Sequence, residues 1–192
     1  MPFVSDLTVT QRPRVERRFR TVDPLVYKGK KDTIIVPPGF DTDFATVPSI
    51  VAWLIERFGT FTAAAVVHDW LCVQLAEYRD EVESQRESLR LTGRAVFPAR
   101  PINSRDADAL FRRILRECDV DFVTRWLMWT GVRWGALFSD YRREGWWRDA
   151  LLVLLISVLA APLVLPPTLL AIVARATVRV VRFFTRSRKA TS

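Results

Sequence analysis

The sequence predicts an α+β fold, in which a small antiparallel N-terminal sheet packs on a helical core and a membrane-associated helical segment follows. Three observations predict it. Roughly the first forty residues contain short β-rich stretches, the next part has apolar residues at helical spacing, and the segment from Ala150 to Ala174 has no charged side chain. With 192 residues, the chain is long enough for one compact body and an appendage.

The strand predictions rest on three stretches rich in β-branched and aromatic residues and separated by turn-forming residues. They are VERRFRTV (15–22), LVYKG (25–29) and TIIVPPG (33–39). The next stretch, FDTDFATVPS, is polar and proline-bounded, so we expect a loop over 40–49. Ser49 at its end is suited to cap a short helix over 50–58.

Three longer helices are predicted in the body, because apolar residues recur there at helical spacing. They cover 63–85, 104–118 and 121–138. The residues suited to cap them are Thr60 or Thr62 for the first and Asn103 or Ser104 for the second, and the third is expected to start at Asp121. From Glu77 to Pro101 the sequence becomes charged and irregular, which favours a solvent-facing loop or insertion.

Five tryptophans fall in or just after the third helix. Trp126, Trp129 and Trp134 could form a ligand box or a membrane belt, but we favour core packing, since helical tryptophans usually bury against neighbouring elements. Trp146 and Trp147 differ because they stand among arginines directly before the apolar segment. Aromatic and arginine residues in that place are typical of a membrane anchor.

The apolar segment is long enough for a bilayer, which needs roughly 20 residues, but Pro166 and Pro167 predict a helix break near Leu165. The piece after the break has arginines spaced four, three and four residues apart, opposite an apolar face. These are Arg175, Arg179, Arg182 and Arg186. A helix with such faces is expected to lie in the headgroup layer of an anionic membrane.

We therefore divide the chain into a body over 1–148 and a membrane-associated segment over 149–192. The basic tail resists translocation, and nothing in the body has the pattern of a secretion signal, so we expect both on the cytoplasmic side of the bacterial inner membrane. That sidedness favours a hairpin with its turn at Pro166-Pro167. A single span and a buried core helix remain the alternatives.

The net charge of +8 does not indicate a sequence-specific nucleic-acid protein, because most of the charge lies in the tail. Residues 175–192 have six basic residues and no acid, or +6, and the rest has 23 basic and 21 acidic residues, or +2. The chain has only two cysteines, Cys72 and Cys118, too few and too widely spaced for a zinc module or a disulfide-dense scaffold.

Four blocks in this order resemble a phage and prophage family called domain of unknown function 1353. They are PPGFDTDFATVP, AAAVVHDWLC, SRDADALFRRIL and GVRWG, and the resemblance covers roughly residues 15–140. The chain departs from the family pattern at Thr46, where serine is usual, and at Cys72, where tyrosine is usual. The resemblance implies a phage or prophage origin and no established activity.

His68 is the only histidine, and acidic residues from three blocks could meet it. We take His68 and Asp108 as the candidate catalytic pair, with His68 as general base and Asp108 orienting it. Asp43 and Asp69 are the candidate ligands for a divalent cation such as Ca²⁺, Mg²⁺ or Mn²⁺. The simpler interpretation is that His68 is a hydrogen-bonded structural residue of an apolar helix.

Two functional hypotheses follow. The first in rank is a noncatalytic phage protein that binds membrane lipid, and other phage proteins, during virion assembly, entry or lysis. The alternative is a metal-assisted hydrolase at the membrane that uses His68 and the acidic residues.

Overall fold

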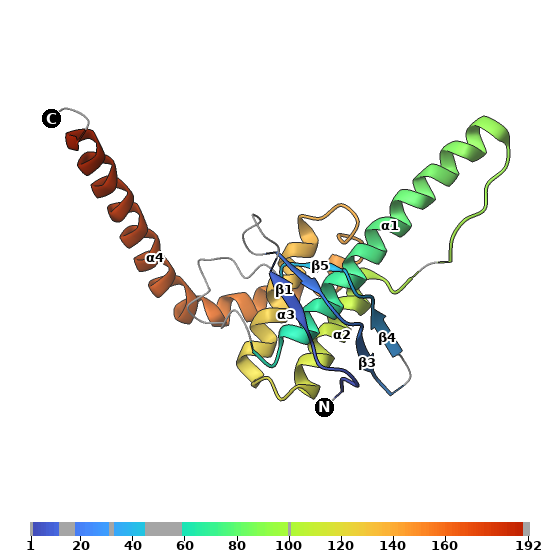
Figure 1. The fold of residues 1–192 in the computed structure, drawn as a ribbon, viewed down its shortest axis with the longest axis horizontal. Helices are drawn as coiled ribbons and strands as arrows, with labels where there is room; N and C mark the ends of the chain where they lie inside the picture. The colour runs from blue at the N-terminus through green and yellow to red at the C-terminus, as the bar shows by residue number, and fades with distance from the viewer. Residues whose placement is uncertain (1, 12–17, 31–32, 45–58, 100, 190–192) are drawn as a thin grey trace.

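The computed structural model describes residues 2–11, 18–30, 33–44, 59–99 and 101–189, with side chains as far as 179. Three predictions fall outside these residues: the role of Thr46, the cap at Ser49 and the helix over 50–58. The described part has an α+β fold, with a small antiparallel strand layer, a helical body and a long C-terminal helix (Figure 1).

Five short strands form two antiparallel sheets. They are β1 (Val9–Gln11), β2 (Phe19–Thr21), β3 (Leu25–Lys28), β4 (Thr33–Val36) and β5 (Asp41–Thr42). One sheet has the order β1-β2-β5, and the other consists of β3 and β4, with Tyr27 opposite Ile34. β5 lies within the segment expected to be a loop, because two residues there pair with β2.

The helices are α1 (Thr62–Thr92), α2 (Ser104–Glu117), α3 (Phe122–Leu137), the short 3-10 helix η1 (Trp146–Arg148) and α4 (Ala150–Lys189). The predicted cap at Asn103 is confirmed, because its side chain accepts from the Asp106 N–H at 2.9 Å. The third helix was expected to start at Asp121, which is its N-cap and accepts from the Thr124 N–H at 2.9 Å. At α1 the cap prediction is wrong, because the N-cap is Phe61, which has no capping side chain.

The loop predicted over 77–101 is wrong as far as Thr92, because α1 continues to that residue and projects beyond the body (Figure 1), and residues 93–99 have no regular structure. We call this projecting part, residues 77–92, the α1 arm. Its residues are mostly good helix formers, and ion pairs one turn apart join Glu83 to Arg86 and Glu87 to Arg90. Gly93 ends the helix in the left-handed conformation, with φ 69°.

Two apolar clusters hold the body together. The larger lies between the strands, α1 and α2, and has Tyr27, Val66 and Ile114 at its centre. The smaller joins α3, η1 and the first turns of α4, with Trp129, Trp146 and Val153 buried in it. The first two turns of α4, from Ala150 to Ile156, thus belong to the packing of the body.

The predicted break at Pro166-Pro167 is wrong, because α4 is helical from Ala150 to Lys189 with Pro162, Pro166 and Pro167 inside it. Each proline removes one backbone hydrogen bond and bends a helix without having to end it. Figure 1 shows this helix leaving the body and changing direction along its length. The hairpin turn expected from the sequence is therefore replaced by one long bent helix.

Candidate functional site

His68 lies in the buried half of α1 and faces Asp108 on α2. Its Nε2 stands 2.6 Å from Asp108 Oδ1, and its ring packs against Phe111 at 4.9 Å between ring centroids. The Cys72 sulfur, one turn further along α1, lies 3.9 Å from Nδ1. Because the His68 side chain is only 3% exposed, the ring is enclosed by the described part of the body.

Asp108 is fully buried and binds two arginines in addition to His68. Arg142 donates to Oδ1 at 2.7 Å, and Arg133 donates to Oδ2 at 2.9 Å. Arg133 is itself fully buried, and the Arg142 side chain is 12% exposed. Burial of a single carboxylate is costly unless charge-assisted hydrogen bonds satisfy it, and here each oxygen has at least one.

The ionic contacts continue from Arg133 to the base of α4. Arg133 Nη2 lies 3.4 Å from Asp149 Oδ2, and Arg105 Nε binds the same carboxylate at 3.0 and 3.1 Å. Asp149 immediately precedes α4, and its carbonyl accepts from the Val153 N–H at 2.9 Å. A continuous chain of charged contacts thus runs from His68 on α1, through α2 and α3, to the first turn of α4. We call it the ionic chain.

The pKa values of the central pair shift in opposite directions. Burial alone lowers the pKa of His68, but the neighbouring Cys72 sulfur and the Asp108 carboxylate oppose it and raise the pKa to about 10. Burial would raise the pKa of Asp108, but the His68 hydrogen bond and charge, followed by Arg142 and Arg133, hold it below its ordinary value. His68 is therefore protonated and Asp108 ionised at neutral pH, which is the state of an ion pair.

The two candidate metal ligands do not lie with this pair. Asp69 points from α1 toward β5, where its Oδ2 accepts from the Thr42 hydroxyl at 2.6 Å, and Thr42 Oγ1 accepts from the Phe44 N–H at 3.1 Å. Asp43 is exposed. Among the residues that the structure describes, no group of three or more histidine, cysteine or acidic side chains is arranged to hold a metal ion.

The candidate membrane residues separate into buried, exposed and undescribed side chains. Trp146 is buried in the smaller cluster, and its indole N–H donates to the Arg133 carbonyl at 2.6 Å. Trp147, in contrast, is 78% exposed. Arg175 and Arg179 lie exposed on α4, and Arg182 and Arg186 belong to the part of α4 whose side chains are not described.

Sequence reasoning missed three members of the ionic chain: Arg133, Arg142 and Asp149. Arg133 had a detectable signal, since a lone arginine within the apolar stretch TGVRWGAL needs a buried partner. Arg142 was assigned to the membrane surface with its arginine neighbours, although the structure turns it inward to Asp108. Asp149 had no comparable signal, because an acid before a helix is expected on helix-dipole grounds alone.

Comparison with known proteins identifies one family. The model described as protein of unknown function (DUF1353) matches residues 19–132, from β2 through most of α3. No curated protein and no solved structure matches. The match contains His68, Asp69 and Asp108 and ends one residue before Arg133. Because it spans more than half of the sequence, and because the blocks around His68 and Asp108 lie inside it, the chain belongs to the DUF1353 family of proteins of unknown function.

Proposed function

We propose that this chain is a membrane-anchored protein of phage or prophage origin that acts without catalysis of its own in virion assembly, entry or lysis. Its body stands at the cytoplasmic face of the bacterial inner membrane, and α4 enters the lipid. The proposal assigns membrane lipid as the first partner and other phage proteins as further partners. The ionic chain serves in it as the joint between anchor and body.

The observation that supports the anchor most is the surface of α4. The stretch Ala150–Arg179 is long and apolar enough to cross a membrane, and only 11% of its most apolar window is buried. Large side chains such as Leu151 and Leu159 are 82% and 71% exposed. A buried core helix would hide such residues, and a water-exposed surface of this kind marks a membrane or protein contact.

α4 also lacks the polar face that a helix lying on the membrane surface needs. Between Ala150 and Ala174 the only polar side chains are Ser157 and Thr168. Ser157 accepts from the Trp134 indole at 3.0 Å and donates to the Val153 carbonyl at 2.7 Å, and Thr168 is buried. The exposed surface of this stretch is therefore apolar all round, which favours insertion into hydrocarbon.

Flotation with vesicles of phosphatidylethanolamine and phosphatidylglycerol tests the anchor. We expect the full chain to float with the vesicles, and Leu155→Glu combined with Leu159→Glu to remain at the bottom, because charges in hydrocarbon are costly. Leu91→Glu is the matched control, since Leu91 on the α1 arm is as exposed as Leu159 and lies outside α4. Equal flotation of all three proteins would contradict the anchor.

Protease protection of a C-terminal tag tests the sidedness. Because α4 has no turn that would bring its end back toward the body, we expect the tag to be protected in vesicles that display the body outside. From Val158 to Ala174 an α-helix extends roughly 25 Å at 1.5 Å per residue, enough to cross a thinned bilayer. A digested tag with a floating protein would show that α4 enters and leaves the same leaflet.

The alternative of a metal-assisted hydrolase has less support in the geometry. A general base must be unprotonated and within reach of water, whereas His68 is enclosed and has a pKa raised to about 10. The aspartates assigned to the metal lie apart from it, with Asp69 bonded to Thr42. His68→Gln separates the two hypotheses: a structural histidine predicts a lower melting temperature, and a catalytic one predicts lost activity at unchanged melting temperature.

A further inference from the structure

The hydrogen bonds around β3 show which edge of its sheet is open. On the outer side of β3, the Val4 N–H donates to the Val26 carbonyl at 3.0 Å, and the Lys28 N–H donates to the Pro2 carbonyl at 2.9 Å. Backbone groups of successive strand residues point to opposite sides in an antiparallel pair. Leu25 and Tyr27 therefore bond inward to β4, through their partners Val36 and Ile34.

The same alternation turns the other residues of β4 outward. Ile35 lies opposite Val26 and Thr33 opposite Lys28, so the backbone N–H and C=O groups of Ile35 and Thr33 point away from β3. No residue in the described ranges bonds to these outward groups. Within the described part of the chain, β4 thus presents an unpaired sheet edge, which natural proteins usually cover or use for pairing.

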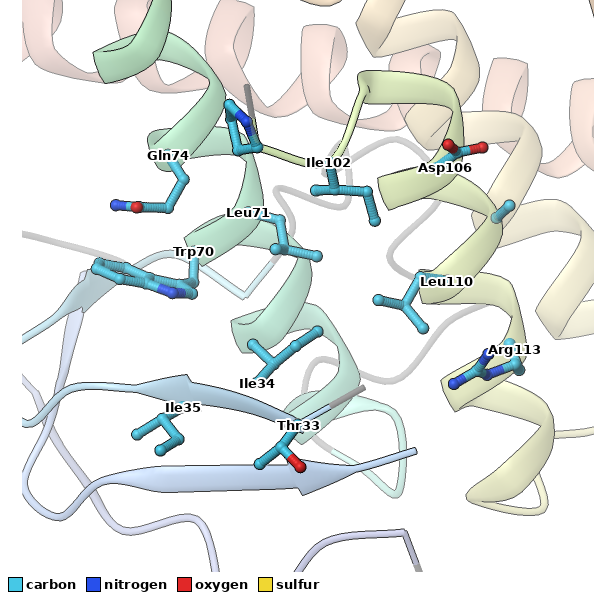
Figure 2. Close-up of a pocket in the computed structure, with 12 residues that line it drawn as sticks. Thr33, Ile34, Ile35, Trp70, Leu71, Gln74, Ile102, Asp106, Leu110 and Arg113 are labelled. Atoms are coloured by element: carbon cyan, nitrogen blue, oxygen red, sulfur yellow. The ribbon is translucent and has the colours of Figure 1, made fainter. Parts of the chain in front are cut away.

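A groove of about 640 Å³ borders this edge. Thr33, Ile34 and Ile35 all line it, and since adjacent strand residues point to opposite faces, the groove wraps around the edge itself. Figure 2 shows β4 below the open space, with Leu71 of α1 and Leu110 of α2 projecting into it. The groove is thus bounded by one strand edge and two helices, and its floor is apolar.

We propose that this groove binds an extended segment of another protein, which adds a strand to β4. Its backbone pairs with the outward groups of Thr33 and Ile35, and every second side chain enters the groove toward Leu71 and Leu110. Main-chain bonds provide affinity in this mode of recognition, and the alternate side chains provide specificity. A lipid or small apolar ligand would leave the backbone groups of β4 unpaired.

The charges on the α2 wall define the segment further. Asp106 and Arg113, an acid and a base on the same helix, both line the groove (Figure 2). Each already has a partner within the chain, since the Asn103 amide donates to Asp106 at 2.6 Å and Arg113 donates to the Tyr27 hydroxyl at 2.9 Å, so a bound segment adds a second contact to each charge. Seven residues of α-helix separate the two charges by roughly 10 Å, and side chains on one face of an extended chain recur about every 7 Å, so the matching charges lie two to four residues apart on the same face. The complementary segment has a basic residue opposite Asp106 and an acidic residue opposite Arg113, with alternating apolar residues between.

The position of the groove fits a protein partner at the membrane. Figure 1 shows β3 and β4 on the side of the body away from the outer part of α4. A body anchored through α4 would therefore keep the open edge of β4 accessible to a partner.

Fluorescence anisotropy of a labelled peptide tests the proposal with the full chain in detergent. The probe is a peptide of about eight residues, alternating valine and threonine, with lysine at the second position and glutamate at the sixth, so that both charges lie on the same face. We expect saturable binding that slows hydrogen exchange of the Thr33 and Ile35 amides. Ile35→Pro removes one outward N–H and leaves the β3 bonds intact, so it should weaken binding at least tenfold.

Two controls keep the test independent of variant folding. The same peptide N-methylated at alternate residues cannot pair with β4, and it should also bind at least tenfold more weakly to the unaltered chain. Asp106→Asn should weaken the lysine peptide about threefold or more, with no effect on a peptide that has norleucine in place of lysine.

Three results would overturn the proposal. One is equal binding of the methylated and unmethylated peptides. A second is no binding to the unaltered chain. The third is protection of the Ile35 amide that rises with protein concentration alone, which would make a second copy of this chain the occupant.

Discussion

Asp108 is the residue on which the ionic chain depends, because it accepts from His68, Arg133 and Arg142 together. Removal of its charge takes from His68 and Arg142 the acidic partner that they share, and leaves Arg133 with only the longer contact to Asp149. We expect Asp108→Asn to lower the free energy of unfolding by about 3–5 kcal/mol.

Chemical denaturation checks this value, with Asp106→Asn as the control on the same helix. Asp106 is exposed, so its neutralisation should cost less than about 1 kcal/mol. Similar losses in the two variants would show that the buried network contributes nothing specific.

His68 gives the molecule a defined dependence of stability on pH. Its pKa is raised to about 10 in the folded state, against about 6.5 in an unfolded chain. A raised pKa contributes stability that is complete below about pH 6.5 and is lost as the pH rises toward 10. We expect the denaturation midpoint of the unaltered chain to fall over this range.

The His68→Gln variant is the comparison for this pH series. It should be less stable at neutral pH and should lose most of the alkaline decline. Asp108 acts in the other direction, since its lowered pKa contributes stability above about pH 4 that is lost on further acidification. An undiminished alkaline decline in His68→Gln would assign the effect to other groups.

At the scale of elements, two glycines have opposite roles. Gly145 precedes η1 with φ 74°, a conformation that costs other residues about 1–2 kcal/mol. Gly131 lies within α3, and a β-carbon there would meet no atom within 4 Å. We expect Gly145→Ala to destabilise the fold and Gly131→Ala to stabilise it by up to about 1 kcal/mol, as measured by thermal denaturation. The same sign for both would contradict this assignment.

The elements that sequence predicted well are those set by local chemistry. Asn103 was a recognisable cap because its side chain bonds to a backbone N–H three residues ahead. The outer half of the α1 arm, residues 86–92, was missed because charge was taken as a loop signal, although glutamate and arginine are good helix formers. The helix break predicted at Pro166 was wrong, because each proline removes only one backbone hydrogen bond and bends α4 without ending it.

The site was predictable only in part, because its contacts join distant segments. The pairing of His68 with Asp108 followed from two motif blocks and the idea that their helices pack together. The inward turn of Arg142 depends on the course of the chain between α3 and η1, which no local pattern specifies. Asp69 was taken as a metal ligand because its actual partner, Thr42, lies on a strand far away in the sequence, and no local pattern indicates that hydrogen bond.

At the scale of the whole molecule, the packing of α4 predicts where truncation is tolerated. Val153 is fully buried and Ile156 packs on the same cluster, so these turns complete the body. We expect a chain ending at residue 161 to fold cooperatively and to stay off membranes. A chain ending at residue 148 lacks Asp149 and exposes Trp129 and Trp146, so it should aggregate or melt at lower temperature.

Circular dichroism and light scattering of the two truncated chains check this expectation. Equal cooperativity and solubility of both would show that the first turns of α4 contribute nothing to the body. Vesicle binding by the longer chain at the level of the full chain would place the anchor outside the outer part of α4.

The first turns of α4 belong both to the body's packing and to the long apolar helix, and this determines the order in which the parts of the chain can fold. The larger cluster uses residues no later than Val132 and can close while synthesis continues, whereas the smaller cluster forms only after Val153 has been synthesised. In the proposed membrane insertion, the first turns of α4 have to pack on Trp129 and Trp146 before the outer part of the helix enters lipid. Early entry of these turns into lipid would leave the smaller cluster open and take Asp149 away from Arg133, which would then keep Asp108 as its acidic partner.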